Sequence, residues 1–122
     1  MSHIFIIEDD EFFSDMLVAM LQQDGHKVTA TNDGIKAMHL LQRIKPDLII
    51  TDILMPNMDG VELIMELSKQ SNETPLIAMS GGRRSISAEF NLGSVKLLGV
   101  KSTLVKPFTH MDLRKAIQEA MA

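Results

Sequence analysis

Residues 48–52 read Leu-Ile-Ile-Thr-Asp, so the apolar run Leu48–Thr51 ends on a carboxylate. The run is too short for an ordinary helix and is rich in β-branched residues, which is typical of a buried strand. Four further runs of this kind occur along the chain: Ile4–Ile7, Lys27–Ala30, Leu76–Met79 and Thr103–Val105. The sequence therefore predicts five short strands.

Apolar residues at helical spacing fill the segments between these strands. The three stripes are Phe13, Leu17, Met20 and Leu21; Ala37, Met38, Leu41 and Ile44; and Val61, Ile64, Met65 and Leu67. Strands joined through helices predict a doubly wound α/β domain, with a parallel sheet covered by helices on both faces.

The C-terminal segment predicts a last helix that begins at Thr109. The Thr109 hydroxyl can cap the backbone N–H near Asp112, and the spacing buries Leu113, Ile117 and Ala120. The segment Gly81–Gly99 follows no regular pattern, so we expect an irregular or shortened fourth helix there.

Length, charge and composition exclude several classes of protein. The 122 residues predict a single domain over residues 1–122. A formal charge of −4 disfavours direct binding to nucleic acid or anionic lipid, and the absence of cysteine excludes disulfides and thiolate chemistry. No apolar run approaches the ~20 residues of a membrane span, and no secretion signal is evident, so we expect a cytoplasmic protein.

Residues with reactive or charged side chains follow the strands, where a parallel sheet gathers its carboxyl ends. They are Glu8 and Asp9, Asp52, Ser80 and Lys106. Clustered carboxylates repel one another, and Mg²⁺ relieves that repulsion while leaving positions for phosphate oxygens, one of which Lys106 could neutralise. Asp52 ends the central run and is the best-placed nucleophile, so the sequence predicts phosphoryl transfer to a carboxylate.

Three blocks of sequence carry a family resemblance: IIEDD at 6–10, DLIITDILMPNMDG at 47–60 and KPF at 106–108. In this order they resemble the receiver domain of two-component response regulators, a CheY-like protein, over essentially the whole chain. The resemblance implies a flavodoxin-like sheet of order 2-1-3-4-5. It also implies a switch that is not an enzyme, phosphorylated on Asp52 by a histidine kinase or phosphotransfer protein and acting on a downstream effector protein as a monomer or weak dimer.

The same resemblance implies roles for individual residues. Asp9, Asp52 and the backbone carbonyl of Leu54 would bind Mg²⁺, with Glu8 acting partly through water. Ser80 and Lys106 would hold the phosphoryl oxygens, and the Lys106–Pro107 bond would be cis. Thr103 stands where the family often has an aromatic switch residue, so a different output face is expected.

Three alternatives compete with the switch. A phosphorylation-independent interaction module would keep the fold, and Thr103 favours it. A metal-dependent phosphohydrolase needs a second carboxylate just beyond Asp52, where position 54 is Leu, and a flavin carrier needs Trp or Tyr, which are absent. Other polar residues have plainer interpretations: Asp10 and Glu11 are predicted to serve the start of the first helix, and all four histidines to be structural or exposed, namely His3, His26, His39 and His110.

Overall fold

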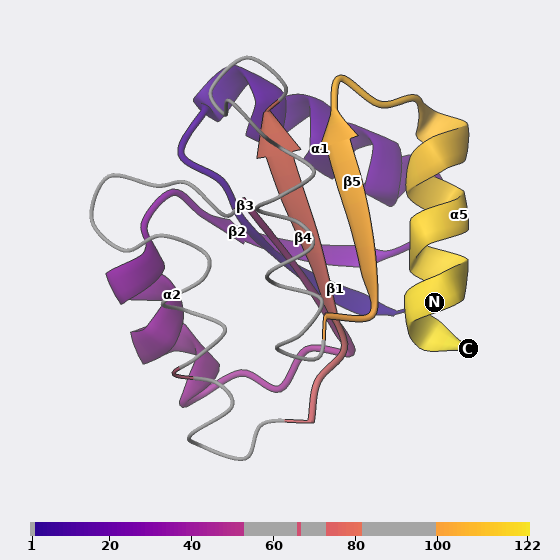
Figure 1. Cartoon of the computed structure of the whole chain (residues 1–122). Coiled ribbons are helices and arrows are strands. Elements are labelled where there is room, and N and C mark those ends of the chain that lie inside the picture. The colour runs from indigo at the N-terminus through magenta and orange to yellow at the C-terminus, as the bar shows by residue number, and fades with distance from the viewer. Residues whose placement is uncertain (1, 53–65, 67–72, 82–99) are drawn as a thin grey trace.

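The computed structural model describes residues 2–52, 66, 73–81 and 100–122 (Figure 1). The strands are β1 (His3–Ile7), β2 (Lys27–Thr31), β3 (Leu48–Asp52), β4 (Leu76–Gly81) and β5 (Ser102–Lys106). The helices are α1 (Glu11–Gln23), α2 (Gly34–Leu41) and α5 (His110–Met121). From β1 to β3 strands alternate with helices, as the sequence predicts, and the residues between β3 and β4 and between β4 and β5 lie mostly outside the described ranges.

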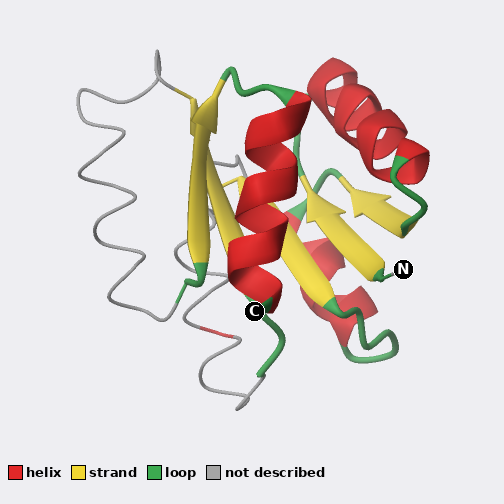
Figure 2. Cartoon of the chain, turned by 90° about the vertical axis from the view of Figure 1, so that its right-hand side faces the viewer, coloured by secondary structure: helices red, strands yellow, loops and turns green. Residues whose placement is uncertain are grey.

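The strands form one parallel sheet in the order β2-β1-β3-β4-β5. This confirms the predicted flavodoxin-like order and places β1 and β3 side by side at the centre. Figure 2 shows α5 in front of the sheet and α2 behind it, so helices cover both faces.

Side chains of successive strand residues point to opposite faces, and each face packs its own core. Phe5 and Ile7 pack with Ala37 and Met38 of α2, whereas Ile4 and Ile6 pack with residues of α1 and α5. All five residues of β3 are buried, which explains why this strand reads as a nearly continuous apolar run.

Side chains cap all three described helices. Asp10 accepts from the N–H of Phe13 at 3.0 Å, and Asp33 accepts from the N–H groups of Ile35 and Lys36. Thr109 accepts from the N–H of Asp112 at 3.0 Å, and the Asp112 carboxylate accepts from the N–H of Thr109 in return. The predicted start of the last helix is confirmed, as is the capping role of Asp10.

Some predicted boundaries were wrong. Ile44 lies beyond the end of α2, because the chain leaves the helix through a turn after Leu41, in which the N–H of Arg43 donates to the carbonyl of Leu40 at 2.9 Å. Strand β4 continues to Gly81, so Ser80 lies within the strand instead of after it. The helix predicted from Val61 to Leu67 and the segment from 82 to 99 lie outside the described residues, except for the helical Glu66.

Three of the histidines form hydrogen bonds with residues distant in the sequence, and His39 is exposed. Their predicted structural or exposed character is confirmed. Within the described ranges, no helix combines the length and the apolar character that crossing a bilayer requires. The expected cellular location stays a prediction.

Candidate functional site

Three charged side chains extend one face of the sheet beyond its core. Glu8 follows β1, and Asp52 and Lys106 are the last residues of β3 and β5. Because side chains alternate along a strand, each lies on the same face as the residue two positions earlier. Those earlier residues belong to the core that packs against α1 and α5: Ile6, Ile50 and Leu104. The strand pattern therefore aims all three charges at one end of the same face.

Lys106 joins the two carboxylates. Its Nζ donates to Oδ2 of Asp52 at 2.9 Å and also to Oε1 of Glu8. The Glu8 and Asp52 side chains are 0% and 3% exposed, and that of Lys106 is 17% exposed. A buried charge without a partner is costly, so this cation is what allows two carboxylates to lie together out of water.

The surroundings shift the pKa values of this group. Burial raises the pKa of Glu8 to about 7, and the neighbouring charge of Asp52 acts in the same direction, while the hydrogen bond from Lys106 opposes it. Burial on its own would lower the pKa of Lys106, but the hydrogen bonds to Glu8 and Asp52 outweigh it, and the pKa is raised. Lys106 is therefore a fixed positive charge at neutral pH.

Asp9 completes an acidic cluster with Glu8 and Asp52. One carboxylate oxygen from each lies within 4.8 Å of the others. Oδ1 of Asp9 is buried, and within the described residues it has no hydrogen-bond partner. Three carboxyl groups stand against a single lysine, so the cluster has the oxygen ligands that suit a hard divalent cation. Leu54, a predicted ligand through its carbonyl, lies outside the described residues.

Ser80 lies on the neighbouring strand. Asp52 is in register with Met79, which places Ser80 one residue further toward the carboxyl end. The side chain is fully buried, and its Oγ has no hydrogen-bond partner in the described part of the chain. A buried hydroxyl without a partner costs free energy. Such a group calls for an explanation, and a ligand that accepts its hydrogen bond in another state of the protein would supply one. The structure thus gathers Glu8, Asp9, Asp52 and Lys106 into one cluster, and Ser80 lies on the adjacent strand, one residue beyond the register partner of Asp52.

The Phe13 ring lies against Lys106, a contact that no sequence pattern predicts. Nζ of Lys106 lies 4.5 Å from the centre of the Phe13 ring. Phe13 in turn packs edge to face against Phe108, with ring centres 5.5 Å apart and an angle of 86° between the ring planes. Helical spacing identified Phe13 only as part of the buried stripe of α1. Contact with a lysine ninety-three positions later depends on how α1 lies on the sheet.

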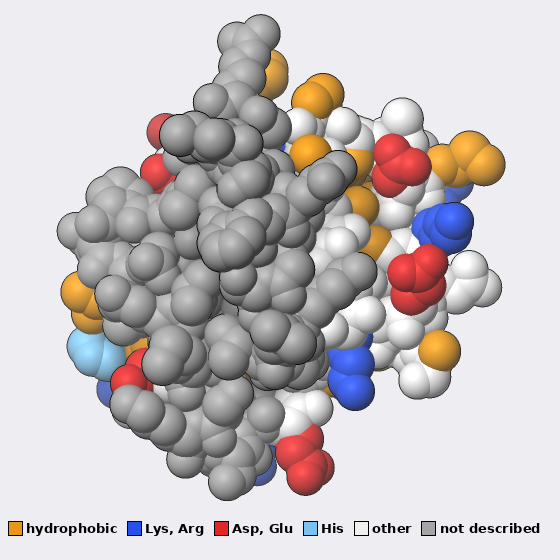
Figure 3. Space-filling view, viewed as in Figure 1, with side chains coloured by type: hydrophobic (Ala, Val, Ile, Leu, Met, Phe, Trp, Pro, Cys, Tyr) orange, Lys and Arg blue, Asp and Glu red, His pale blue; other side chains and the backbone are white. Residues whose placement is uncertain are grey.

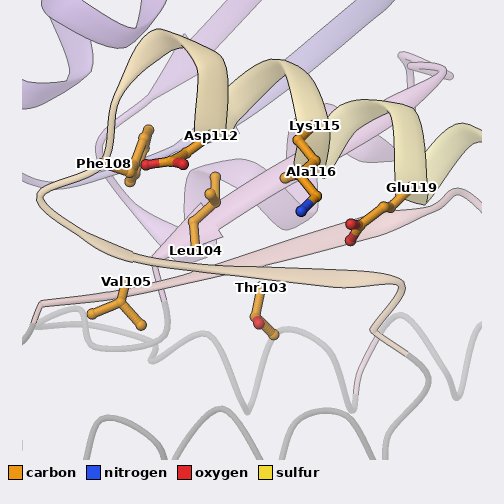
Figure 4. Close-up of a pocket in the computed structure, with 8 residues that line it drawn as sticks. All are labelled: Thr103, Leu104, Val105, Phe108, Asp112, Lys115, Ala116 and Glu119. Carbon is orange, nitrogen blue, oxygen red and sulfur yellow. The ribbon is translucent and has the colours of Figure 1, made fainter.

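The surface near these residues is hollowed in two places. A cavity of about 390 Å³ opens beside Glu8, between Ser14 of α1 and Asn32 and Lys36 at the start of α2. A second cavity, of about 280 Å³, lies along β5 and α5. Figure 4 shows Leu104 pointing toward α5, while Thr103 and Val105 point to the other side of the strand.

Charged side chains of both signs surround α5. Figure 3 shows them interspersed with apolar groups on the side of the molecule where α5 lies. Asp112, Lys115 and Glu119 line the cavity beside β5 and follow one another along the helix. This part of the surface is therefore mixed in charge.

Comparison with known proteins places these features in a family. The sequence profile for the response regulator receiver domain matches residues 4–118. The chain is 32% identical over 117 residues to the transcription factor SKN7 of Saccharomyces cerevisiae, covering 94% of this chain and 18% of that protein. It is 31% identical over 109 residues to the regulator of RpoS of Escherichia coli, covering 89% and 31%. The chain thus spans about a fifth to a third of the length of these relatives.

Solved structures agree in fold. The chemotaxis response regulator CheY4 of Vibrio cholerae has a TM-score of 0.86 and 29% identity, and the match covers 98% of each chain. The receiver domain of a sensor histidine kinase from Pseudomonas aeruginosa, solved with a magnesium ion coordinated in its active site cleft, has a TM-score of 0.84 and 27% identity over 98% of this chain and 97% of that one.

Proposed function

The chain belongs to the family of response regulator receiver domains of two-component signalling, and from this premise we propose that it is a switch operated by phosphorylation of Asp52. One observation carries the proposal. Asp52 is buried beside a lysine and two further carboxylates at the carboxyl end of a parallel sheet, with the Ser80 hydroxyl, which has no hydrogen-bond partner among the described residues, on the adjacent strand. We further propose that the chain has no substrate of its own to turn over, and serves as an acceptor.

The acceptor step forms one bond and breaks another. A carboxylate oxygen of Asp52 attacks phosphorus, and the bond from phosphorus to the donor breaks with its electron pair leaving on the donor atom. For a phosphohistidine donor, that atom is a ring nitrogen of imidazole. Lys106 is placed to exchange its contact with the Asp52 carboxylate for one with a phosphoryl oxygen, and the buried Ser80 hydroxyl can donate to another.

Mg²⁺ fits the acidic cluster. Asp9 and Asp52 would hold it, with Glu8 nearby, and the observation in favour of a ligand there is Oδ1 of Asp9, which is buried and has no hydrogen-bond partner in the described ranges. When bound, such an ion neutralises the charge on phosphoryl oxygens. The structural relative solved with magnesium in its active site cleft supports the same assignment.

The modified protein would act by a shift in population. New contacts from the phosphoryl group to Ser80 and Lys106 stabilise one arrangement of the loops at this edge of the sheet, which changes affinity for another protein. The donor would be a histidine kinase or a phosphotransfer protein, and the receiver of the signal a downstream effector protein. Thr103 points away from α5 on β5, at the position where the resemblance implies that the family often has an aromatic residue.

Intact mass after incubation with acetyl phosphate and Mg²⁺ tests the proposal. We expect one phosphoryl adduct on the parent chain, absent without Mg²⁺ and absent in Asp52→Asn, an isosteric change that removes the nucleophilic carboxylate. Asp15→Asn is the matched control, because Asp15 is an exposed acid of α1, and it should be labelled like the parent.

A folded parent chain that binds Mg²⁺ but forms no adduct would contradict the proposal. That result would favour the alternative, an interaction module that keeps the receiver fold and binds its partner without phosphorylation. An adduct that persists in Asp52→Asn would instead show that another residue is the acceptor.

A further inference from the structure

We propose that Phe13 is a positioning residue, whose ring face holds the ammonium of Lys106 at the acceptor carboxylate. The inference rests on the proposed function, because it assigns Phe13 a part in the phosphorylation of Asp52. It goes further by naming a residue on α1, outside the acidic cluster, that acts through Lys106 without touching the phosphoryl group.

The geometry is that of a cation–π contact. Nζ of Lys106 lies 4.5 Å from the centre of the Phe13 ring, inside the ~6 Å over which a ring face attracts an ammonium group. The same Nζ donates to Glu8 and to Asp52. The ring therefore lies against an ammonium group that is already bound to both carboxylates.

The Phe13 ring is itself held in place. Its backbone N–H donates to the capping carboxylate of Asp10 at 3.0 Å, which ties this residue to the first turn of α1. The ring packs against the core on the α1 and α5 side and meets Phe108 edge to face. Phe108 follows Lys106 by two residues, so both ends of the contact belong to ordered parts of the fold.

The contact matters because lysine is flexible. Its side chain carries four methylene groups and a point charge with no preferred direction, so holding it in one place costs conformational entropy. An aromatic face stabilises the ammonium group without supplying an oxygen that would compete with phosphoryl oxygens. Lys106 can then pass from the carboxylate of Asp52 to a phosphoryl group on Asp52 while it stays over the same ring.

Phe12 supplies a control built into the chain. It precedes Phe13 on α1, but 84% of its surface is exposed, since a helix turns about 100° per residue and directs the two rings differently. Phe13→Leu removes the π face and keeps apolar volume, Phe12→Leu makes the same change at the exposed neighbour, and Phe13→Tyr restores an aromatic face.

The first measurement is the rate of phosphorylation of the full chain by acetyl phosphate at saturating Mg²⁺. We expect Phe13→Leu to slow the rate about three- to tenfold, the range that one partly desolvated cation–π contact represents. Phe12→Leu should stay within about twofold of the parent, and Phe13→Tyr should recover most of the lost rate. Equal rates for Phe13→Leu and Phe12→Leu would overturn the proposal.

The second measurement reads the contact without any phosphorylation. Protons that lie over a ring face are shielded, so the ammonium protons of Lys106 should resonate upfield of the other lysines in a ¹⁵N–¹H spectrum, where Lys106→Arg identifies the signal by removing it. The upfield shift should vanish in Phe13→Leu and persist in Phe12→Leu and Phe13→Tyr.

The two measurements separate the proposals from each other. An unshifted Lys106 signal in the parent chain would overturn the role of Phe13, whatever the phosphorylation rates are. A shifted signal that depends on Phe13, in a chain that forms no adduct, would leave the contact in place and refute the proposed phosphorylation.

Discussion

At the scale of single residues, the candidate site is a balance of charges. Asp9, Glu8 and Asp52 bring three carboxylates together, and Lys106 compensates two of them by direct contact. Oδ1 of Asp9 is the atom in this group that is buried without a described partner. Asp9 therefore adds to the repulsion among the carboxylates when no cation is bound, and it would contribute a ligand when one is.

Asp9→Asn should separate these two effects. Without Mg²⁺ the variant should be at least as stable as the parent, because it removes one negative charge from a cluster of like charges. With increasing Mg²⁺, the parent should gain thermal stability through binding to the native state, and the variant should lose most of that gain. Melting followed by circular dichroism is the suitable measurement, since the chain has no Trp or Tyr.

Glu11→Gln is the control for this experiment, because Glu11 is an exposed acid in the first turn of α1. It should keep the Mg²⁺-dependent rise in melting temperature. If Asp9→Asn gained as much stability from Mg²⁺ as the parent, Asp9 would not be a ligand.

At the scale of the elements, an ion-pair cluster joins the end of α1 to the start of α5. Asp24, which caps the C-terminus of α1, accepts from His110 Nε2 at 2.9 Å and from two nitrogens of Arg114, the shortest contact being 2.8 Å. Hydrogen bonds from Arg114 and then His110 hold the pKa of Asp24 well below its ordinary value of 3.8. The cluster links two helices that cover the same face of the sheet.

The lowered pKa predicts how this link depends on pH. A carboxylate with a depressed folded-state pKa contributes stability above its unfolded-state pKa, and the contribution is lost as pH falls toward the folded-state pKa. Asp24→Asn should therefore be less stable than the parent at pH 7, and the difference should shrink as the pH falls below about 4. Urea unfolding from pH 7 to pH 3 measures this difference.

Asp15→Asn, an exposed acid in the middle of α1, is the comparison for the pH series and should show little difference at any pH. A stability difference for Asp24→Asn that stayed constant down to pH 3 would mean that the ion pairs are not its source.

At the scale of the whole molecule, the sheet separates two cores. Ile50 lies on the central strand β3, fully buried in the core on the α1 and α5 side, two residues before Asp52. Packing at this position therefore supports both the fold and the placement of the acceptor carboxylate.

Ile50→Ala should cost about 2–5 kcal/mol in the free energy of unfolding, because it leaves a cavity between the central strand and the helices. Ile35→Ala is the matched control: Ile35 is 47% exposed near the start of α2, and its truncation should cost about 0.5 kcal/mol or less. Denaturant unfolding compares the two variants, and similar losses for both would contradict the two-core description.

Local sequence was sufficient for the elements whose signals are themselves local. Strand periodicity and the capping residues Asp10 and Thr109 depend on neighbours in the chain, and they were predicted correctly. The convergence of Asp9, Asp52 and Lys106 was also predictable, because parallel strands bring their carboxyl ends to one edge of a sheet. The end of α2 was missed because the chain turns after Leu41, although the apolar stripe continues to Ile44.

The sequence by itself thus determined the order of the described strands and helices and which charged residues converge at the carboxyl ends of the strands. Only the tertiary structure decided which atoms pair: Lys106 with Glu8 and Asp52, its ammonium with the ring of Phe13, and Asp24 with His110 and Arg114. The physical reason is distance along the chain. Periodicity and caps act over a few residues, whereas these pairs join residues tens of positions apart, and their geometry depends on how α1 and α5 pack on the sheet.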